Sequence, residues 1–208
     1  MGKLIAIEGA DHIGKSSIIN NVVGYMRTIN NATVNTIHFP NEDNHDIQCY
    51  LQGRYPDMKP LEVAMMFARD RVQSSCVLYD SINHNDYTIL DRYVLSNILY
   101  QCGMIWDSTH SPQLMHELNQ NLLDYEYIIN RLPEPDMTLF IKRQAVIPTD
   151  FDNDDILETN ITLQNFVNDN ADNIFFKDIR HGKFQLLEAD YLDNQDVEEL
   201  IIGAITNE

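Results

Sequence analysis

The chain has 208 residues and carries 32 acidic against 14 basic residues, so its formal net charge is −18. A single domain of this length buries roughly 70% of the surface of its unfolded chain, and a hydrophobic content of 44% supplies such a core. The charge argues against proteins that bind DNA or RNA non-specifically, because that binding depends on lysine and arginine.

Neither the cysteines nor the apolar runs indicate a secreted or membrane protein. Cys49, Cys76 and Cys102 are odd in number and widely spaced, so free thiols in a reducing cytosol are expected, not disulfides or a zinc site. The N-terminus lacks a signal pattern, and no apolar run approaches the roughly 20 residues that cross a bilayer. We therefore expect a cytoplasmic protein. Abundant asparagine and isoleucine suggest an AT-rich coding sequence, which fits a virus acting in a host cytoplasm as well as an AT-rich microbe.

The first predicted strand leads into a phosphate-binding loop. Leu4 to Ile7 form an apolar run, and the segment from Gly9 to Ser16 matches the pattern G-x-x-x-x-G-K-[ST]. The two glycines let successive backbone N–H groups turn toward a phosphate. Lys15 would reach the β- and γ-phosphates of a nucleotide, and Ser16 would offer its hydroxyl to Mg²⁺. The expected nucleotide-binding residues are Gly9, His12, Gly14, Lys15, Ser16 and Ser17.

The next segments alternate between helix and strand patterns. A helix is expected near Lys15 to Ile29, with its positive end directed at the bound phosphate, and a strand over Ala32 to His38. The stretch from Asn41 to Tyr55 is polar and reads as irregular. From Pro60 a long helix is predicted to run past Leu78 toward Ile82.

The third predicted strand, Tyr87 to Leu90, ends at the triplet Asp91-Arg92-Tyr93. Open α/β sheets build their sites from residues at the carboxyl ends of strands. Arg92 would provide a second anion site besides the phosphate-binding loop, and Asp91 would contact the metal's water or orient an acceptor. Two anion sites favour phosphoryl transfer, which depends on positioning the reactants and neutralising the charge of the moving group.

The rest of the chain predicts further helices, two strands and a flap. The expected elements are helices over Val94–Cys102, ended by Gly103, over Pro112–Asn130 and over Val197–Ile205, and strands over Met137–Ile141 and Phe184–Leu187. The segment from Gln144 to Phe176 has seven acids and no lysine or arginine, and is predicted as a flap within one domain that spans residues 1–208. The fold class is α/β, with a mainly parallel five-stranded sheet covered by helices on both faces.

Several short motifs, in their order and spacing, resemble those of the thymidylate kinase family of P-loop nucleoside monophosphate kinases. They are Glu8-Gly9 with Asp11, Phe39-Pro40, Phe67 to Gln73, Asp91-Arg92-Tyr93, Ser96-Asn97 with Tyr100-Gln101, and Pro135 to Thr138. The likeness runs from Ile5 to Ile205. It implies a P-loop kinase fold with a lid at 144–176, ATP and Mg²⁺ as cofactors, dTMP as the acceptor, and a homodimer formed through packed helices. No nucleic acid polymer and no membrane is expected as a partner.

The resemblance also implies roles for individual residues. The expected catalytic residues are Lys15, Arg92, Asp91 and Asp11, and the expected metal ligands are Ser16 and Asp91. Substrate contacts are implied for Asp11 beside the sugar and phosphate, Phe39 and Pro40 along the nucleoside, Arg92 on the acceptor phosphate, Phe67, Arg71 and Asn97 on the base, and Tyr100 against a 2′-hydroxyl. On the residues alone, core packing of Phe67 and Tyr100 and surface positions for Arg71 and Asn97 stay open.

The chain departs from the family pattern in its arginines. The family supplies a catalytic arginine in the phosphate-binding loop, at the position of His12, or in the flap, and often another where Glu42 stands. Neither the loop nor the flap has one here. His12 fits a hydrogen-bond donor to a phosphate, and a role as a spacer fits it at least as well. Candidate replacements are Lys142, Arg143, Lys177, Arg180 and Lys183, of which Arg143 and Arg180 come first. Alternatives to a dTMP kinase are a kinase for another deoxynucleoside or deoxynucleoside monophosphate, and a nucleotide-binding module with weakened catalysis.

Overall fold

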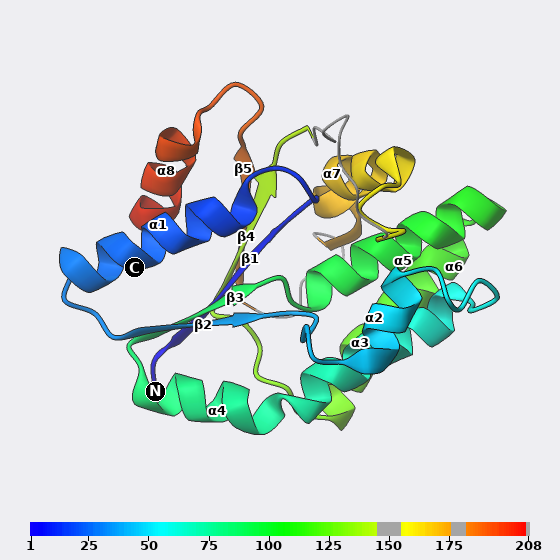
Figure 1. Ribbon diagram of the computed structural model, residues 1–208, viewed down its shortest axis with the longest axis horizontal. Helices are drawn as coiled ribbons and strands as arrows, with labels where there is room; N and C mark the ends of the chain where they lie inside the picture. Colours follow the sequence, from blue (N-terminus) through cyan, green and yellow to red (C-terminus); the bar gives the residue numbers. More distant parts are fainter. Residues whose placement is uncertain (145–154, 176–181, 207–208) are drawn as a thin grey trace.

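A five-stranded sheet forms the centre of the molecule (Figure 1). The computed structural model describes residues 1–144, 155–175 and 182–206. The strands are β1 (Lys3–Gly9), β2 (Val34–His38), β3 (Tyr87–Asp91), β4 (Met137–Lys142) and β5 (Lys183–Glu188), in the order β2-β3-β1-β4-β5. Each neighbouring pair is parallel. The prediction of an α/β fold with a mainly parallel five-stranded sheet is confirmed.

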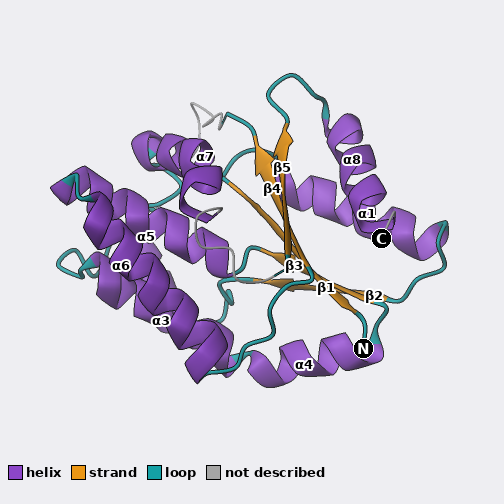
Figure 2. Cartoon of the chain, turned by 180° about the vertical axis from the view of Figure 1, so that it is seen from behind, coloured by secondary structure: helices purple, strands orange, loops and turns teal. Residues whose placement is uncertain are grey.

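Helices cover both faces of this sheet (Figure 2). Because successive side chains of a strand point to opposite faces, Ile5 and Ile7 of β1 pack with α1 (Lys15–Thr28) and α8 (Asn194–Thr206), whereas Leu4 and Ala6 pack into a second apolar cluster. The remaining helices lie on that second face and beyond the carboxyl ends of the strands. They are α2 (His45–Leu51), α3 (Pro60–Gln73), α4 (Ser75–His84), α5 (Val94–Thr109), α6 (Pro112–Leu123) and α7 (Ile161–Phe175).

Two helical regions differ from the sequence prediction. The stretch read as irregular contains α2, whose first turn is capped by the Asn44 side chain accepting from Ile47 N. Seven residues make about two turns, which is too short for an apolar repeat to stand out. The long helix expected from Pro60 is broken at Ser74 into α3 and α4, because Ser74 leaves helical geometry with φ −84° and ψ 1°.

The end predicted for α5 at Gly103 is also wrong. This helix continues to Thr109, and Gly103 lies where α7 crosses it. A Cβ atom at Gly103 would stand 2.5 Å from Leu163 Cδ1 and 2.9 Å from Phe166 Cδ1. The glycine therefore permits close helix packing instead of ending the helix. After α6 the chain continues as a π-helix, η1 (Asp124–Ile129).

The close contact of Gly103 with α7 predicts opposite effects for two glycine substitutions. Gly103→Ala should lower the free energy of unfolding by about 1–3 kcal/mol, because the new methyl group overpacks the contact between α5 and α7. Gly24→Ala is the matched control in α1, where a Cβ meets nothing within 4 Å. It should raise stability by up to about 1 kcal/mol through helix propensity. Urea denaturation of both variants tests this, and a stabilising Gly103→Ala would contradict the packing role.

Other expectations concern the cysteines, the flap and the membrane. Cys49, Cys76 and Cys102 are all free, as predicted, and Cys76 is exposed. In the described ranges, none of the helices combines the length and apolar character needed to cross a membrane. Within the predicted flap, α7 is described, whereas 145–154 lies outside the described residues.

Candidate active site

The loop after β1 has the predicted arrangement, between a strand and the N-terminus of a helix. Gly14 has φ 83°, in the left-handed region that favours glycine, and directly precedes α1. The N-terminus of this helix thus faces the loop with its backbone N–H groups. Lys15 is buried, with its Nζ 3.6 Å from Asp91 Oδ1. Burial, followed by the charge of Arg92, lowers the pKa of Lys15 below its ordinary value.

Ser16 and Asp91 lie together at the foot of this loop. Ser16 Oγ is 3.4 Å from Asp91 Oδ2, and Oδ1 of Asp91 is buried without a hydrogen-bond partner among the described residues. Burial raises the pKa of Asp91, but a hydrogen bond from His38 and the charges of Lys15 and Arg92 outweigh it, so the pKa falls below its ordinary value. An ionised carboxylate beside a hydroxyl fits Mg²⁺, which takes one or two protein oxygens and completes its shell with water and phosphate. In the described ranges no group of three or more acidic, histidine or cysteine side chains could hold a metal on its own.

Arg92 is anchored between the loop and α5. Its backbone has φ 68°, a left-handed conformation that is rare outside glycine and often occurs at functional sites. Its Nη1 donates to Gly9 O (3.0 Å) and Ser96 Oγ (3.2 Å), and its Nη2 pairs with Asp11. Behind it, the fully buried Glu8 accepts from Ser96 Oγ and from Tyr93 N. Burial raises the pKa of Glu8.

Asp11 joins the loop to α5 and α7. Besides Arg92, its carboxylate accepts from the Tyr100 hydroxyl and, at 2.8 Å, from Gln164 Nε2. Gln164 is fully buried, and its Oε1 accepts from Asp11 N at 2.7 Å and from the Tyr100 hydroxyl at 3.0 Å. Burial raises the pKa of Asp11, but Arg92 and Lys15 outweigh it and lower the pKa. Gln164 was missed by the sequence prediction because its partners lie 153 and 64 residues away.

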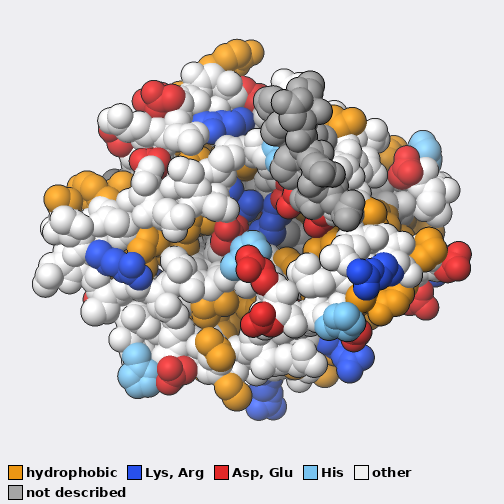
Figure 3. All heavy atoms as spheres, in the orientation of Figure 1, with side chains coloured by type: hydrophobic (Ala, Val, Ile, Leu, Met, Phe, Trp, Pro, Cys, Tyr) orange, Lys and Arg blue, Asp and Glu red, His pale blue; other side chains and the backbone are white. Residues whose placement is uncertain are grey.

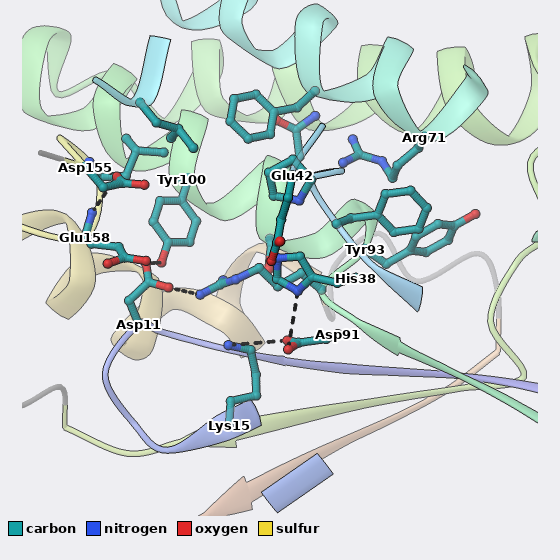
Figure 4. A pocket seen from close by; sticks show the side chains of 18 of the residues that line it. Asp11, Lys15, His38, Glu42, Arg71, Asp91, Tyr93, Tyr100, Asp155 and Glu158 are labelled. Carbon is teal, nitrogen blue, oxygen red and sulfur yellow. Dashed lines mark hydrogen bonds and ion pairs between the residues drawn. The ribbon is translucent and has the colours of Figure 1, made fainter. Parts of the chain in front are cut away.

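A cleft of about 480 Å³ opens between the loop and the helices beyond the sheet. Figure 3 shows the hollow near the centre of this face, where basic, acidic and histidine side chains meet. Lys15 and Asp91 lie at one end of the cleft and Arg71 at the other (Figure 4). Its volume lies within the range of small-molecule sites. Every predicted substrate-binding residue lines it, namely Asp11, Phe39, Pro40, Phe67, Arg71, Arg92, Asn97 and Tyr100.

The far end of the cleft contains a buried ion pair. Arg71 Nε and Nη2 each donate to a carboxylate oxygen of Glu126 at 2.6 Å, with the two side chains 2% and 0% exposed. Burial lowers the pKa of Arg71, but the charge of Glu126 outweighs it and raises the pKa. This pairing fixes the guanidinium and leaves Nη1 outside the pair. Glu126 lies in η1 and had no sequence signal; π-helical turns are frequent at functional sites.

Two amide side chains that line the same cleft carry buried acceptors. Asn97 Nδ2 donates to Ala64 O at 2.9 Å. The Oδ1 of Asn97 and the Oε1 of Gln101 are buried and have no hydrogen-bond partner within the described part of the chain. Both residues line the cleft and stand four positions apart on α5, on one face of the helix. Such acceptors need a donor from a ligand or from water.

Comparison with known proteins is consistent with this geometry. Residues 7–175 match the family model described as thymidylate kinase. The chain belongs to the thymidylate kinase family. The curated relative from Mycobacterium tuberculosis, itself a thymidylate kinase, is 32% identical over 111 residues, which are 50% of this chain and 51% of that protein. The one from Schizosaccharomyces pombe is 26% identical over 145 residues, 67% of this chain and 60% of that protein. The matches thus span about half to three fifths of these relatives.

Solved thymidylate kinases share the whole fold. The enzyme from Candida albicans superposes with a TM-score of 0.72 at 22% identity, covering 99% of this chain and 92% of its own. The one from Ehrlichia chaffeensis gives 0.65 at 19% identity, with 99% of each chain covered. At these identities the likeness concerns the fold. The predicted family resemblance and P-loop kinase fold are confirmed.

The structure also places the residues that could replace the family arginine, which is absent from the phosphate-binding loop and the flap of this chain. His12, in the family's arginine position, has Nε2 3.8 Å from Glu158 Oε2 and does not line the cleft. Lys142 pairs with Glu188 at 3.2 Å. Lys183 is the first residue of β5 and lies at the amino end of the sheet, whereas the site lies at the carboxyl end. Arg143 donates to the chain's own carbonyl groups. Lys177 and Arg180 lie outside the described residues.

Proposed function

We propose that this protein transfers the γ-phosphoryl group of ATP to dTMP, giving ADP and dTDP. The main observation in support is that one cleft is lined by the lysine of the phosphate-binding loop, by Asp91 and Arg92, and by buried side chains that can form hydrogen bonds with a base. Lys15 and the loop N–H groups bind the ATP phosphates. Ser16 and Asp91 would hold Mg²⁺, which would supply positive charge to neutralise the phosphates. Arg92 binds the acceptor phosphate, with Asp11 fixing its guanidinium.

The hydrogen-bonding groups that line the cleft complement thymine in a pose that directs its C4 carbonyl at Arg71. Nη1 of Arg71 is a donor, whereas Asn97 Oδ1 and Gln101 Oε1 are acceptors. Thymine offers a carbonyl oxygen at C4 and an N–H at N3, which complement these groups. In that pose cytosine would place its amino group against the Arg71 donor and its unprotonated N3 against an acceptor, so these buried groups would lack partners. Phe67 lines the same cleft and supplies an aromatic surface for stacking.

A panel of acceptors tests the proposed substrate. Products formed from ATP with dTMP, thymidine, dCMP or dGMP are separated by ion-exchange chromatography, with Lys15→Ala as the background. dTDP from dTMP should be the dominant product. Faster conversion of thymidine, dCMP or dGMP would replace dTMP kinase by one of the alternative kinases.

Gln101→Met should weaken base recognition. Methionine preserves the volume of glutamine but removes the acceptor, and the loss of one hydrogen bond to the base should lower kcat/KM for dTMP about tenfold. The ratio of dTMP to dCMP turnover should narrow in the same assay. Gln113→Met is the control, because Gln113 is exposed on α6 and its side chain donates to Glu117 on the same helix. An unchanged substrate ratio in Gln101→Met would remove this residue from the base site.

We further propose a homodimer, as the family resemblance implies. Leu61 on α3 and Leu114 on α6 are 50% and 44% exposed on neighbouring helices, which suits a packed helical interface. Light scattering on the purified protein distinguishes a dimer from a monomer.

A further inference from the structure

The Arg143 guanidinium donates to four backbone carbonyl groups and one side-chain oxygen. It follows β4 directly, and a guanidinium group has five N–H donors. These donate to Ile13 O (3.0 Å), Ala189 O (3.2 Å), Leu192 O (2.9 Å), Asp193 O (3.3 Å) and Asn194 Oδ1 (2.7 Å). Every donor therefore has an acceptor within the chain. The side chain is not available to fold over phosphates, in contrast to the role that its sequence position suggests.

The acceptors belong to two segments that are far apart in the sequence. Ile13 lies in the phosphate-binding loop, and 189–194 connects β5 to α8. Asn194 also adjoins the loop, because a Cβ on Gly14 would stand 3.3 Å from its Nδ2. The backbone N of Arg143 donates to Asn168 Oδ1 of α7 at 3.0 Å, which fixes the base of the side chain. Arg143 therefore sets the position of 189–194 relative to the loop.

The sheet order places this contact on the donor side of the site. The cleft with Asp91, Arg92 and His38 lies at the carboxyl ends of β3 and β2, on one side of β1. A nucleoside triphosphate with its phosphates in the loop and its γ-phosphate toward that cleft must extend its nucleoside the other way. That direction leads over the carboxyl ends of β4 and β5, where Arg143 and 189–194 lie (Figure 1).

We propose that Arg143 is a positioning residue for the donor nucleotide. By bonding 189–194 to the phosphate-binding loop, it presents a preformed surface to the nucleoside of ATP, and preformed surfaces bind without a further ordering cost. The inference rests on the proposed function for the identity of the donor but not for that of the acceptor. Among the described residues, the hydrogen-bond partners of Arg143 do not line the cleft that we assign to dTMP.

Two substitutions test this role by their effect on each substrate. Arg143→Lys retains the charge but cannot reproduce the planar fork, and Arg143→Met removes both. Each should raise KM for ATP, and the Kd of ATP measured by calorimetry without dTMP, by about tenfold or more. KM for dTMP and kcat should change less than about threefold. The circular dichroism spectrum of each variant should match that of the wild type, which shows that the fold is retained. Lys142→Met is the control, since it removes the neighbouring cation, whose partner is Glu188 on the surface.

The alternative outcomes are distinct. A loss of kcat of about 10³-fold with unchanged KM for ATP is the signature of a catalytic arginine and would overturn the proposal. Equal rises in KM for both substrates, or unchanged ATP affinity in both variants, would overturn it too. If the wild-type protein bound ATP but did not phosphorylate dTMP, the proposed acceptor would be refuted, and the calorimetric comparison would still decide the role of Arg143.

Discussion

Arg92→Lys is expected to lower kcat/KM for dTMP by about 10³-fold, the scale of an arginine that stabilises transferring phosphoryl groups. The guanidinium donates simultaneously to Gly9 O, Ser96 Oγ and Asp11 while facing the cleft. A lysine ammonium is a point charge that cannot satisfy these partners and also bind a phosphate in a bidentate manner. Steady-state kinetics with ATP and dTMP, each varied in turn, measure the effect.

Arg69→Lys provides the matched control for this substitution. Arg69 is exposed on α3, and the same change there should leave both kinetic constants within about twofold of the wild type, as is usual for exposed positions. If Arg92→Lys retained more than one tenth of the wild-type kcat/KM while Arg69→Lys was unaffected, Arg92 would not be the acceptor-phosphate ligand.

Glu126→Ala is expected to lower the free energy of unfolding by about 3–5 kcal/mol, because it leaves Arg71 charged and unpaired in the protein interior. Glu126 and Arg71 are 0% and 2% exposed, so the loss of the carboxylate leaves the guanidinium away from bulk solvent. Urea denaturation measures the change. Glu117→Ala, on the exposed side of α6, is the control and should alter stability by no more than about 0.5 kcal/mol.

A double variant separates the stability of this pair from its function. Arg71→Met with Glu126→Leu replaces the ion pair by apolar groups of similar size, which commonly restores stability. The double variant should therefore unfold near the wild-type urea midpoint but have a KM for dTMP raised at least about tenfold, since the donor to the base is gone. If the double variant bound dTMP normally, Arg71 would have a structural role alone.

The parts of the fold that the sequence predicts are those with strong local signals. The strand expected at Phe184–Leu187 is observed as Lys183–Glu188, and the phosphate-binding loop lies where its glycines indicate, because both depend on neighbouring residues. The helix α2 was missed because its buried residues Ile47, Cys49 and Tyr50 do not repeat over a further turn. Gly103 was misread because its close contact is with α7, which is distant in sequence.

The same reasoning explains which site residues were missed. Glu126 acts through Arg71, 55 residues away, and Gln164 acts through Asp11, 153 residues away, so neither belongs to a short motif. Gln101 had a partial signal, since it stands one turn after Asn97 on the same helix face. Arg143 was a candidate for the missing family arginine because it borders the flap, but its contacts depend on where 189–194 folds. Motifs thus predicted the lining of the cleft, and tertiary contacts determine what supports it.

The most direct test of the central claim is ADP production from ATP and dTMP by the wild-type protein and by Lys15→Ala, measured in parallel with ATP binding. Five carboxylates line the cleft, namely Asp11, Glu42, Asp91, Asp155 and Glu158, and Arg71 and Arg92 are its only arginines among the described residues. We expect ADP and dTDP to form in equal amounts at a rate far above that of Lys15→Ala. ATP binding without turnover above Lys15→Ala would contradict the proposed kinase and identify a nucleotide-binding module.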